Sequence, residues 1–311
     1  MNRKTSHAGM TLVELVVAMT IAAIVGIMVL HVVLGFQSRI LAEISRNDLQ
    51  DRAERLIRFM ASDIRDAAFL LGPVPLTAGG APLTLTHDSL AGDPVETISS
   101  SLIAEDVFAG DDRLTIVKAE PFTPPMRLAQ AAQVGETSVV LNRRPNFSPG
   151  STRELQPAPE AINHLVFANH RSCYPLQRAD LVVDLERPLE EAVSADTEVL
   201  GLRASTYVAE PFAGSRRLRR DDFTSRDILD EAVDGLQFEY LLDNGAIVDQ
   251  PSSIRTVSGV RISLLVRSLR QDRDYTDTGL YTLANRVYGP FRDHFRRHLV
   301  THLVEVKNHG L

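Results

Sequence analysis

The residue most able to do unusual chemistry in this sequence is Glu14, a carboxylate at the start of a long apolar run. The run extends from Leu15 to Phe36 and contains no Asp, Glu, Lys or Arg. A charge at the centre of a membrane costs about 2.5–3.5 kcal/mol on insertion scales, so it normally needs a partner. The dipole of a helix N-terminus and a position near the membrane interface would each favour Glu14. A cation from another molecule is the alternative partner.

Three histidines near the C-terminus, His294, His298 and His302, recur every four residues. On a helix this spacing would align three imidazoles, as in a metal site. On a strand each step would span about 13 Å, which is too far for one ion to be shared. The resemblance described below favours a strand for the latter part of this segment, so we expect no metal or other cofactor here.

The remaining charged clusters are weak candidates for ligand sites. A basic cluster that could hold phosphates is formed by Arg216, Arg217, Arg219 and Arg220. Two aspartates follow it directly and no aromatic residue is interleaved, so we expect a solvated loop instead. Acidic groups that could bind calcium occur at Asp111/Asp112, Glu190/Glu191 and Asp272/Asp274. None of these groups has the spacing of an EF-hand loop.

Composition and motifs argue against catalysis and against general binding to nucleic acid. The net charge is −7, which disfavours coating of nucleic acid by charge alone. No P-loop, G-x-S-x-G, H-E-x-x-H or paired-cysteine zinc motif occurs in the sequence. Cys173 is the only cysteine, so an intrachain disulfide is impossible and a buried thiol is the expected state. We therefore expect a protein without a catalytic site.

The apolar run that follows Glu14 predicts a transmembrane helix. Its 22 residues would span about 33 Å, close to the thickness of a hydrocarbon core. Arg3 and Lys4 precede the run, so the positive-inside rule places the N-terminus in the cytoplasm. Everything after Gln37 is then periplasmic or extracellular.

The N-terminus resembles the leader of type IV prepilins. The small residue Gly9 precedes the apolar run, followed by Met10-Thr11-Leu12-Val13-Glu14. The resemblance implies cleavage by a prepilin peptidase between Gly9 and Met10, and N-methylation of Met10. The family more often has phenylalanine where this chain has Met10.

The same resemblance answers the question that Glu14 raises. In pilins the glutamate at the fifth mature position is thought to meet the new α-amine of a neighbouring subunit, and Thr11 belongs to the same assembly segment. An ion pair at about 4 Å and an effective dielectric constant near 20 is worth roughly 4 kcal/mol before desolvation. Since desolvation removes much of this energy, we interpret Glu14 as a residue for subunit register and recruitment.

A second helical segment continues the apolar run. Apolar residues recur at three- and four-residue intervals from Ile40 to Leu71. Its outer face is expected to carry ion pairs four residues apart, namely Asp48/Arg52, Asp51/Arg55 and Glu54/Arg58. Gly72-Pro73 is the predicted stop, which gives one helix of about 60 residues, or roughly 90 Å.

The rest of the chain favours short strands. Residues 73–112 are rich in Pro, Gly, Thr and Ser and are expected to form loops with short extended pieces. Strands are predicted at 114–117, 138–141, 164–167, 181–185, 236–242, 247–248 and 260–266. Asp243-Asn244-Gly245 predicts a hairpin turn between the fifth and sixth of these.

Together these elements predict an α+β fold in which a long N-terminal helix packs against a mainly antiparallel β head. The predicted parts are a leader (1–9), a transmembrane or filament-core half of the helix (10–36), an amphipathic half (37–72) and a β-rich head (73–311).

Three later segments narrow the resemblance. LQDRAERLIRFMASDIRDAAFLL is similar to the helix of PilW-type minor pilins, VDGLQFEYLLDNG with VSGVRISLLVRS to their paired strands, and RRHLVTHLVEVKN to their closing strand. Residues 73–230 have no such counterpart. GspJ-type pseudopilins of type II secretion share the helix pattern but are usually shorter, and they remain the alternative, as does an anchored periplasmic adhesin or enzyme that is never cleaved.

The resemblance implies a minor pilin that acts in type IV pilus assembly, in a priming or tip complex. Its expected partners are major and minor pilins, the prepilin peptidase, the inner membrane and the pilus assembly platform. The expected location is the inner membrane and then the pilus at the cell surface.

Overall fold

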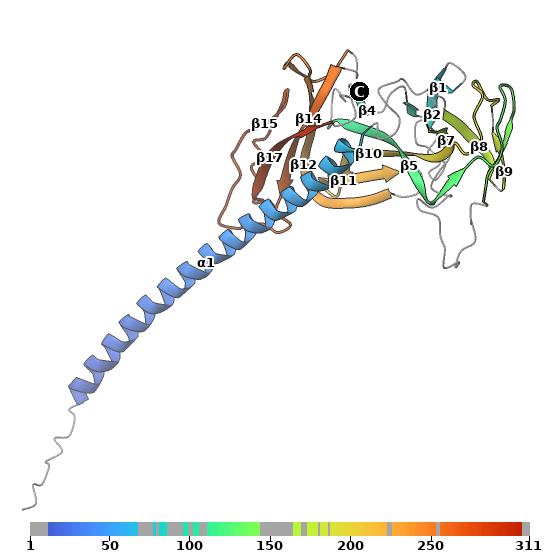
Figure 1. Ribbon diagram of the computed structural model, residues 1–311. Coiled ribbons are helices and arrows are strands. Elements are labelled where there is room, and N and C mark those ends of the chain that lie inside the picture. Colours follow the sequence, from blue (N-terminus) through green and yellow to red (C-terminus); the bar gives the residue numbers. More distant parts are fainter. Residues whose placement is uncertain are drawn as a thin grey trace, which may run out of the picture. The chain divides into compact units, whose positions relative to one another are not determined.

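The computed structural model describes residues 12–67, 77–78, 81–85, 96–98, 102–105, 111–143, 164–168, 173–179, 181–185, 187–222, 226–252 and 256–306 (Figure 1). The chain divides into two compact units, Met1–Gln50 and Asp51–Leu311. A long N-terminal helix and a mostly antiparallel sheet confirm the predicted α+β class. The four-part division into leader, two helix halves and head stays a prediction.

Helix α1 runs from Leu12 to Arg65, 54 residues, and so joins the two predicted helical segments into one. It ends before the predicted stop at Gly72-Pro73, which lies outside the described residues. At its end the Asp66 amide donates to Ser62 O and Asp63 O, and the Ala67 amide donates to Ile64 O at 3.1 Å. These shorter i→i−3 bonds tighten the last turn. The Gly-Pro pair predicted only the furthest point that the helix could reach, and the hydrogen bonds of Asp66 and Ala67 end it earlier.

The described strands form three sheets. Those of the 12-stranded sheet are β4 (Leu102–Glu105), β5 (Arg113–Arg127), β6 (Ser138–Val140), β7 (His164–Phe167), β8 (Cys173–Ala179), β9 (Val182–Leu185), β10 (Glu198–Phe212), β11 (Ser215–Asp222), β12 (Arg226–Leu242), β13 (Ile247–Val248), β14 (Val257–Arg267) and β17 (Arg297–Glu305). A small sheet contains β1 (Thr77–Ala78), β2 (Ala81–Leu85) and β3 (Glu96–Ile98), and a hairpin contains β15 (Tyr281–Leu283) and β16 (Arg286–Tyr288). The main path follows the order β17-β14-β12-β11-β10-β7-β8-β9-β6 (Figure 1).

The strongest strand predictions lie at the C-terminal side of this sheet. Strand β12 pairs antiparallel with β14, and β14 pairs antiparallel with β17. The turn at 243–245 also returns the chain as predicted, because Tyr240 pairs with Val248 and Leu241 with Ile247. Gly245 has φ +82° there, a left-handed conformation that glycine adopts without a steric penalty.

The head buries one face of the last turns of α1. Within Asp51–Leu311, helical residues at three- and four-residue spacing are buried, namely Ala53, Leu56, Ile57, Met60, Ala61 and Ile64. Phe59 lies beside them with its ring centroid 6.4 Å from that of Tyr207 on β10. Burying each large side chain contributes about 1.5–3 kcal/mol. The amphipathic pattern of the sequence thus corresponds to a real packing face.

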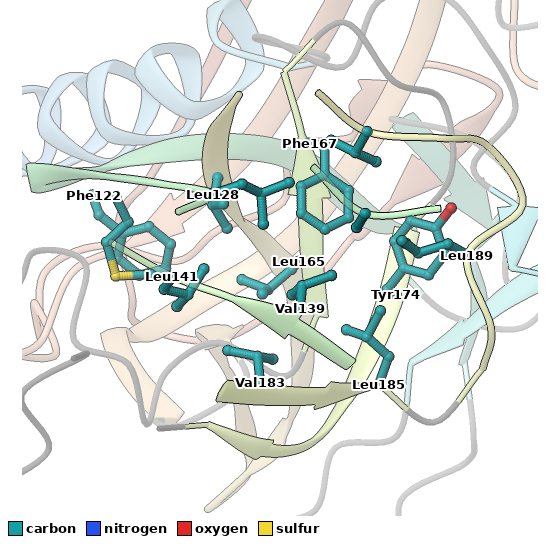
Figure 2. Close-up of a cluster of buried hydrophobic side chains, with 14 residues drawn as sticks. Phe122, Leu128, Val139, Leu141, Leu165, Phe167, Tyr174, Val183, Leu185 and Leu189 are labelled. Carbon is teal, nitrogen blue, oxygen red and sulfur yellow. The ribbon is translucent and has the colours of Figure 1, made fainter. Parts of the chain in front are cut away.

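A second core lies inside an inserted lobe, which we define as residues 122–199. Fourteen buried side chains form it: Phe122, Met126, Leu128, Ala132, Val139, Leu141, Leu165, Phe167, Tyr174, Val183, Leu185, Leu189, Val193 and Val199. Figure 2 shows them gathered between the strands of the lobe. The lobe begins and ends on two paired strands, where Leu200 opposes Pro121 but Val199 opposes Met126. Residues 122–125 are therefore looped out of the ladder at this junction.

Two long strands, β10 and β11, were not predicted. Strand β11 has the sequence Ser-Arg-Arg-Leu-Arg-Arg-Asp-Asp, and the expectation of a solvated loop is wrong for it. It pairs with β10 on one side and with β12 on the other. An almost wholly polar segment lacks the alternation that marks a half-buried strand, but its backbone is satisfied by two neighbours.

Candidate functional site

The apolar segment of α1 is the first candidate functional element. Leu15–Val33 is 19 residues long with a mean hydropathy of 2.6, and none of it is buried in the structure. By length and composition alone it is able to cross a membrane. Its one described polar contact is internal, since the Thr20 hydroxyl donates to Val16 O at 2.8 Å. The hydroxyl therefore needs no partner outside the helix.

The predicted processing residues lie at the border of what the structure describes. Gly9, Met10 and Thr11 are outside the described residues, and Glu14 lies in α1, whose backbone is described at that position but not this side chain. Cleavage after Gly9, methylation of Met10 and assembly through Thr11 and Glu14 therefore stay predictions.

In the head, Arg52 anchors the last turns of α1 to β12. Its Nη2 atom donates to both carboxylate oxygens of Asp230, at 2.6 and 2.7 Å, and Nε donates to Oδ2 at 3.1 Å. Nη1 donates to the backbone oxygen of Arg267 at 3.2 Å. The two side chains are 8% and 10% exposed. Arg52 is thus buried, and the prediction of an exposed pair with Asp48 is wrong for it.

A second polar contact joins the same part of α1 to the sheet. The Tyr207 hydroxyl on β10 donates to Asp63 Oδ2 at 2.6 Å. Arg220 on β11 and Lys118 on β5 lie 3.1 and 3.6 Å from the same carboxylate. Burial, and then the adjacent carboxylate, raise the pKa of Tyr207 well above its ordinary value. The phenol therefore remains a donor at neutral pH.

The arginines of β11 are engaged in ion pairs. Arg216 pairs with Asp111, and Arg217 pairs with Glu210 on β10. Arg219 lies 2.7 Å from Glu210 and 2.6 Å from Asp221. With Arg220 bound to Asp63, each of the four guanidinium groups has a carboxylate. A phosphate would have to displace these partners, so the cluster favours sheet cohesion over binding of nucleic acid.

The acidic groups considered as calcium ligands are also used within the head. Asp111 and Asp112 are 4% and 6% exposed, and their carboxylates accept the amides of Leu236 and Phe238 at 2.9 and 2.8 Å. Asp272 accepts from Arg296 at 2.7 Å. Glu190 and Glu191 are exposed. Within the part of the chain that the structure describes, no group of three or more His, Cys, Asp or Glu side chains could hold a metal ion.

The three histidines are separated by the fold. His298 and His302 lie in β17, opposite Val266 and Ile262 of β14. His294 precedes the strand, and its Nδ1 atom lies 2.6 Å from the backbone oxygen of Tyr275. The predicted strand is confirmed for the latter part of the segment. Its spacing of about 3.3 Å per residue prevents these imidazoles from sharing one ion.

A cluster that the sequence analysis did not find surrounds Arg297, whose side chain is only 1% exposed. Its guanidinium group donates to Asp234, Asp277 and Asp293 at distances between 2.6 and 2.8 Å. The ring of Phe291 lies 3.5 Å from the guanidinium carbon. These contacts fasten the segment between β14 and β17 to the sheet. Asp293 is four residues away, but Asp277 and Asp234 are 20 and 63 residues away, so local spacing does not predict the cluster as a whole.

Comparisons with known proteins agree with these elements. Residues 4–30 match the prokaryotic N-terminal methylation motif, and residues 207–308 match the family model of Type IV Pilus-assembly protein W, PilW. No curated protein and no solved structure matches the chain.

The chain shares an apolar N-terminal helix, an antiparallel head and the methylation motif at its start with type IV pilus-related pilins. The match over β11, β12, β14 and β17 narrows this class and confirms the resemblance to PilW-type pilins with a prepilin motif.

Proposed function

We propose that this protein is a non-catalytic minor pilin that assembles in the priming or tip complex of a type IV pilus. The observation that carries the proposal is the combination of a leader match at 4–30 with an unburied apolar span at Leu15–Val33. A processed pilin needs such a helix to pack among other helices or in lipid. The PilW match at 207–308 supports the pilus over the secretion alternative.

The proposed processing follows from the leader. The prepilin peptidase cuts between Gly9 and Met10 and methylates Met10, with the N-terminus in the cytoplasm and the head in the periplasm. Glu14 then pairs with the freed α-amine of an adjacent subunit, with Thr11 in the same segment. The head is large, since the compact unit extends from Asp51 to Leu311. Steric crowding along a filament therefore favours a low copy number near its tip.

The test uses two variants of the full chain expressed in a piliated host. Gly9→Ala leaves the precursor uncut, so its mass stays that of the full chain. Glu14→Ala is cut and methylated normally, but its amount in sheared filaments falls at least about tenfold, which corresponds to roughly 1.4 kcal/mol. Val16→Ala, two residues further along the helix, is the matched control and incorporates normally.

Three results would contradict the proposal. Native protein whose N-terminus is Met1 would mean that no leader is removed. Glu14→Ala at normal amounts in filaments would remove the pairing role. Absence of the native protein from purified filaments, together with loss of protein export on deletion, would favour the pseudopilin alternative.

A further inference from the structure

Within the described part of the chain, strand β17 pairs with β14 alone and forms an edge of the main sheet. Among the described strands of that sheet with a single neighbour, β6, β4 and β13 have three, four and two residues, whereas β17 has nine. Such an edge presents unpaired N–H and C=O groups, which other strands can bind. Very short strands avoid this, but β17 does not have that protection.

The register shows which backbone groups face outward. Ser268 N donates to Arg296 O, and Val306 N donates to Ser258 O, at 2.8 and 3.0 Å. These residues flank the ladder between β14 and β17, so residues 298, 300, 302 and 304 continue the hydrogen-bonded positions. The alternate residues direct their amides and carbonyls away from β14. Leu299, Thr301 and Leu303 are the central three of this outward set.

The outward edge is also unprotected by side chains. The strand reads Arg-His-Leu-Val-Thr-His-Leu-Val-Glu, without Lys or Pro, and its pairing with β14 has no register shift. Lys, Pro and β-bulges are features by which proteins prevent an edge strand from pairing with another chain. Thr301 is exposed and Leu303 is 46% exposed. The described residues therefore leave the centre of the edge accessible.

The same edge is complementary to itself. An antiparallel second copy centred on Thr301 sets Leu299 opposite Leu303 twice and Thr301 opposite Thr301. At both ends the exposed Glu305 lies opposite Arg297, whose buried guanidinium stays bound to its own three aspartates, so this pair adds no new ion pair. In this register the outward amides and carbonyls of residues 297, 299, 301, 303 and 305 all lie in hydrogen-bonded pairs with the second copy.

We propose that β17 pairs antiparallel with β17 of a second copy of this chain, in the register Thr301 to Thr301, and joins two sheets into one. The inference goes beyond the proposed function and does not depend on processing of the leader. The exposed Leu303 side chains gain burial against Leu299 of the other copy, and the central Thr301 residues exchange two hydrogen bonds.

Cysteine cross-linking of the full chain in detergent tests the register. In a Cys173→Ser background, Thr301→Cys forms a disulfide-linked homodimer on mild oxidation, because hydrogen-bonded pairs have Cα atoms about 5.5 Å apart, within disulfide range. Leu303→Cys alone gives no dimer, since the two cysteines would lie about 13 Å apart. Leu299→Cys combined with Leu303→Cys restores it. Val287→Cys, at 62% exposure on β16, is the control for random collision.

A backbone variant tests the hydrogen bonds. Thr301→Pro removes an outward amide that β14 does not use, and it weakens dimerisation about tenfold or more with the thermal unfolding of each subunit little changed. Thr301→Val retains the amide and dimerises like the native chain. Equal dimerisation of the proline variant, equal cross-linking by Leu303→Cys alone, or cross-linking of Thr301→Cys only to a different pilin would overturn the pairing of two copies.

Discussion

At the residue scale, the head contains buried arginines that are paired with carboxylates. Arg297 is the most enclosed of them, with three aspartates and an aromatic ring around it. A buried charge is costly unless it is paired, and losing one partner leaves the others unpaired. These contacts therefore have a structural role. Their contribution to the free energy of unfolding is best measured by replacing Arg297, the cation that the three aspartates share.

We predict that Arg297→Met lowers the free energy of unfolding of the head by about 3–5 kcal/mol, because it leaves Asp234, Asp277 and Asp293 close together without their cation. Urea unfolding followed by circular dichroism measures the change. Arg273→Met, at an exposed position in the same segment, serves as the control and changes stability by less than about 0.5 kcal/mol. A small effect of Arg297→Met would contradict the structural role.

A pH dependence is expected from Asp293. Hydrogen bonds from Arg297 hold the pKa of this carboxyl below its ordinary value, against the effect of burial. Such a group stabilises the folded state above the unfolded pKa of about 3.9, and this contribution is lost as pH falls through the lower folded value. The stability difference between the native chain and Asp293→Asn should therefore be full at pH 7 and shrink below about pH 4.

Thermal unfolding at a series of pH values measures this difference. Asp274→Asn, at an exposed position in the same segment, is the matched control. A stability gap for Asp293→Asn that stays constant into the acid range would show that the ionised carboxyl contributes nothing beyond its hydrogen-bonding shape.

At the scale of elements, α1 and β12 are joined by one bidentate ion pair. Arg52 and Asp230 are both nearly buried, and the guanidinium also caps the backbone of β14 at Arg267. Their position within the head means that the end of α1 is attached by directional bonds as well as by apolar packing. The orientation of this end of the helix on the sheet is thereby specified.

A double-mutant cycle should show this coupling. Arg52→Met and Asp230→Asn are each expected to cost about 3 kcal/mol in the free energy of unfolding, since each leaves a buried partner unsatisfied. The double variant should cost less than their sum, with a coupling energy of about 1–3 kcal/mol. Arg55→Met, which changes an exposed arginine of the same helix, is the control. Simple additivity would show that the pair does not act as a unit.

At the scale of the whole molecule, the PilW match at residues 207–308 covers one part of the main sheet, and the inserted lobe lies outside that match. The lobe has its own core of residues between 122 and 199 and is connected to the sheet through β5 and β10. Separate cores are the physical basis of separable units.

We predict that the lobe can be removed without unfolding the rest. Pro121 and Leu200 are cross-strand partners, so an Asn-Gly turn can join them in place of residues 122–199. The shortened chain should unfold cooperatively and still be recovered in filaments. Ala213→Asn, which places the same turn residues in the natural β10–β11 hairpin at φ +45°, is the control for the turn itself. Loss of cooperative unfolding in the shortened chain would mean that the two cores depend on each other.

Features that depend on residues close together in the sequence could be predicted, and features that depend on contacts between distant residues could not. The apolar run, the helix and the turn at Gly245 were readable from neighbouring residues. So was the alternation in β12 and β14, because one buried face repeats every second residue. The same local reasoning failed for β11, which pairs with two strands but lacks the alternation of apolar and polar residues. It also failed for Arg52, which lies among charged residues of the helix but contacts the sheet.

The sequence by itself determined the apolar span, the leader resemblance and the α+β class, since hydrophobic length and period act within a few residues. Only the tertiary structure decided where the charges are used. Arg52 and Asp230 are 178 residues apart, and the partners of Arg297 come from three separate places in the chain. Contacts of this kind depend on the order of strands in the sheet and on which segments cover it, and no spacing along the chain encodes that order.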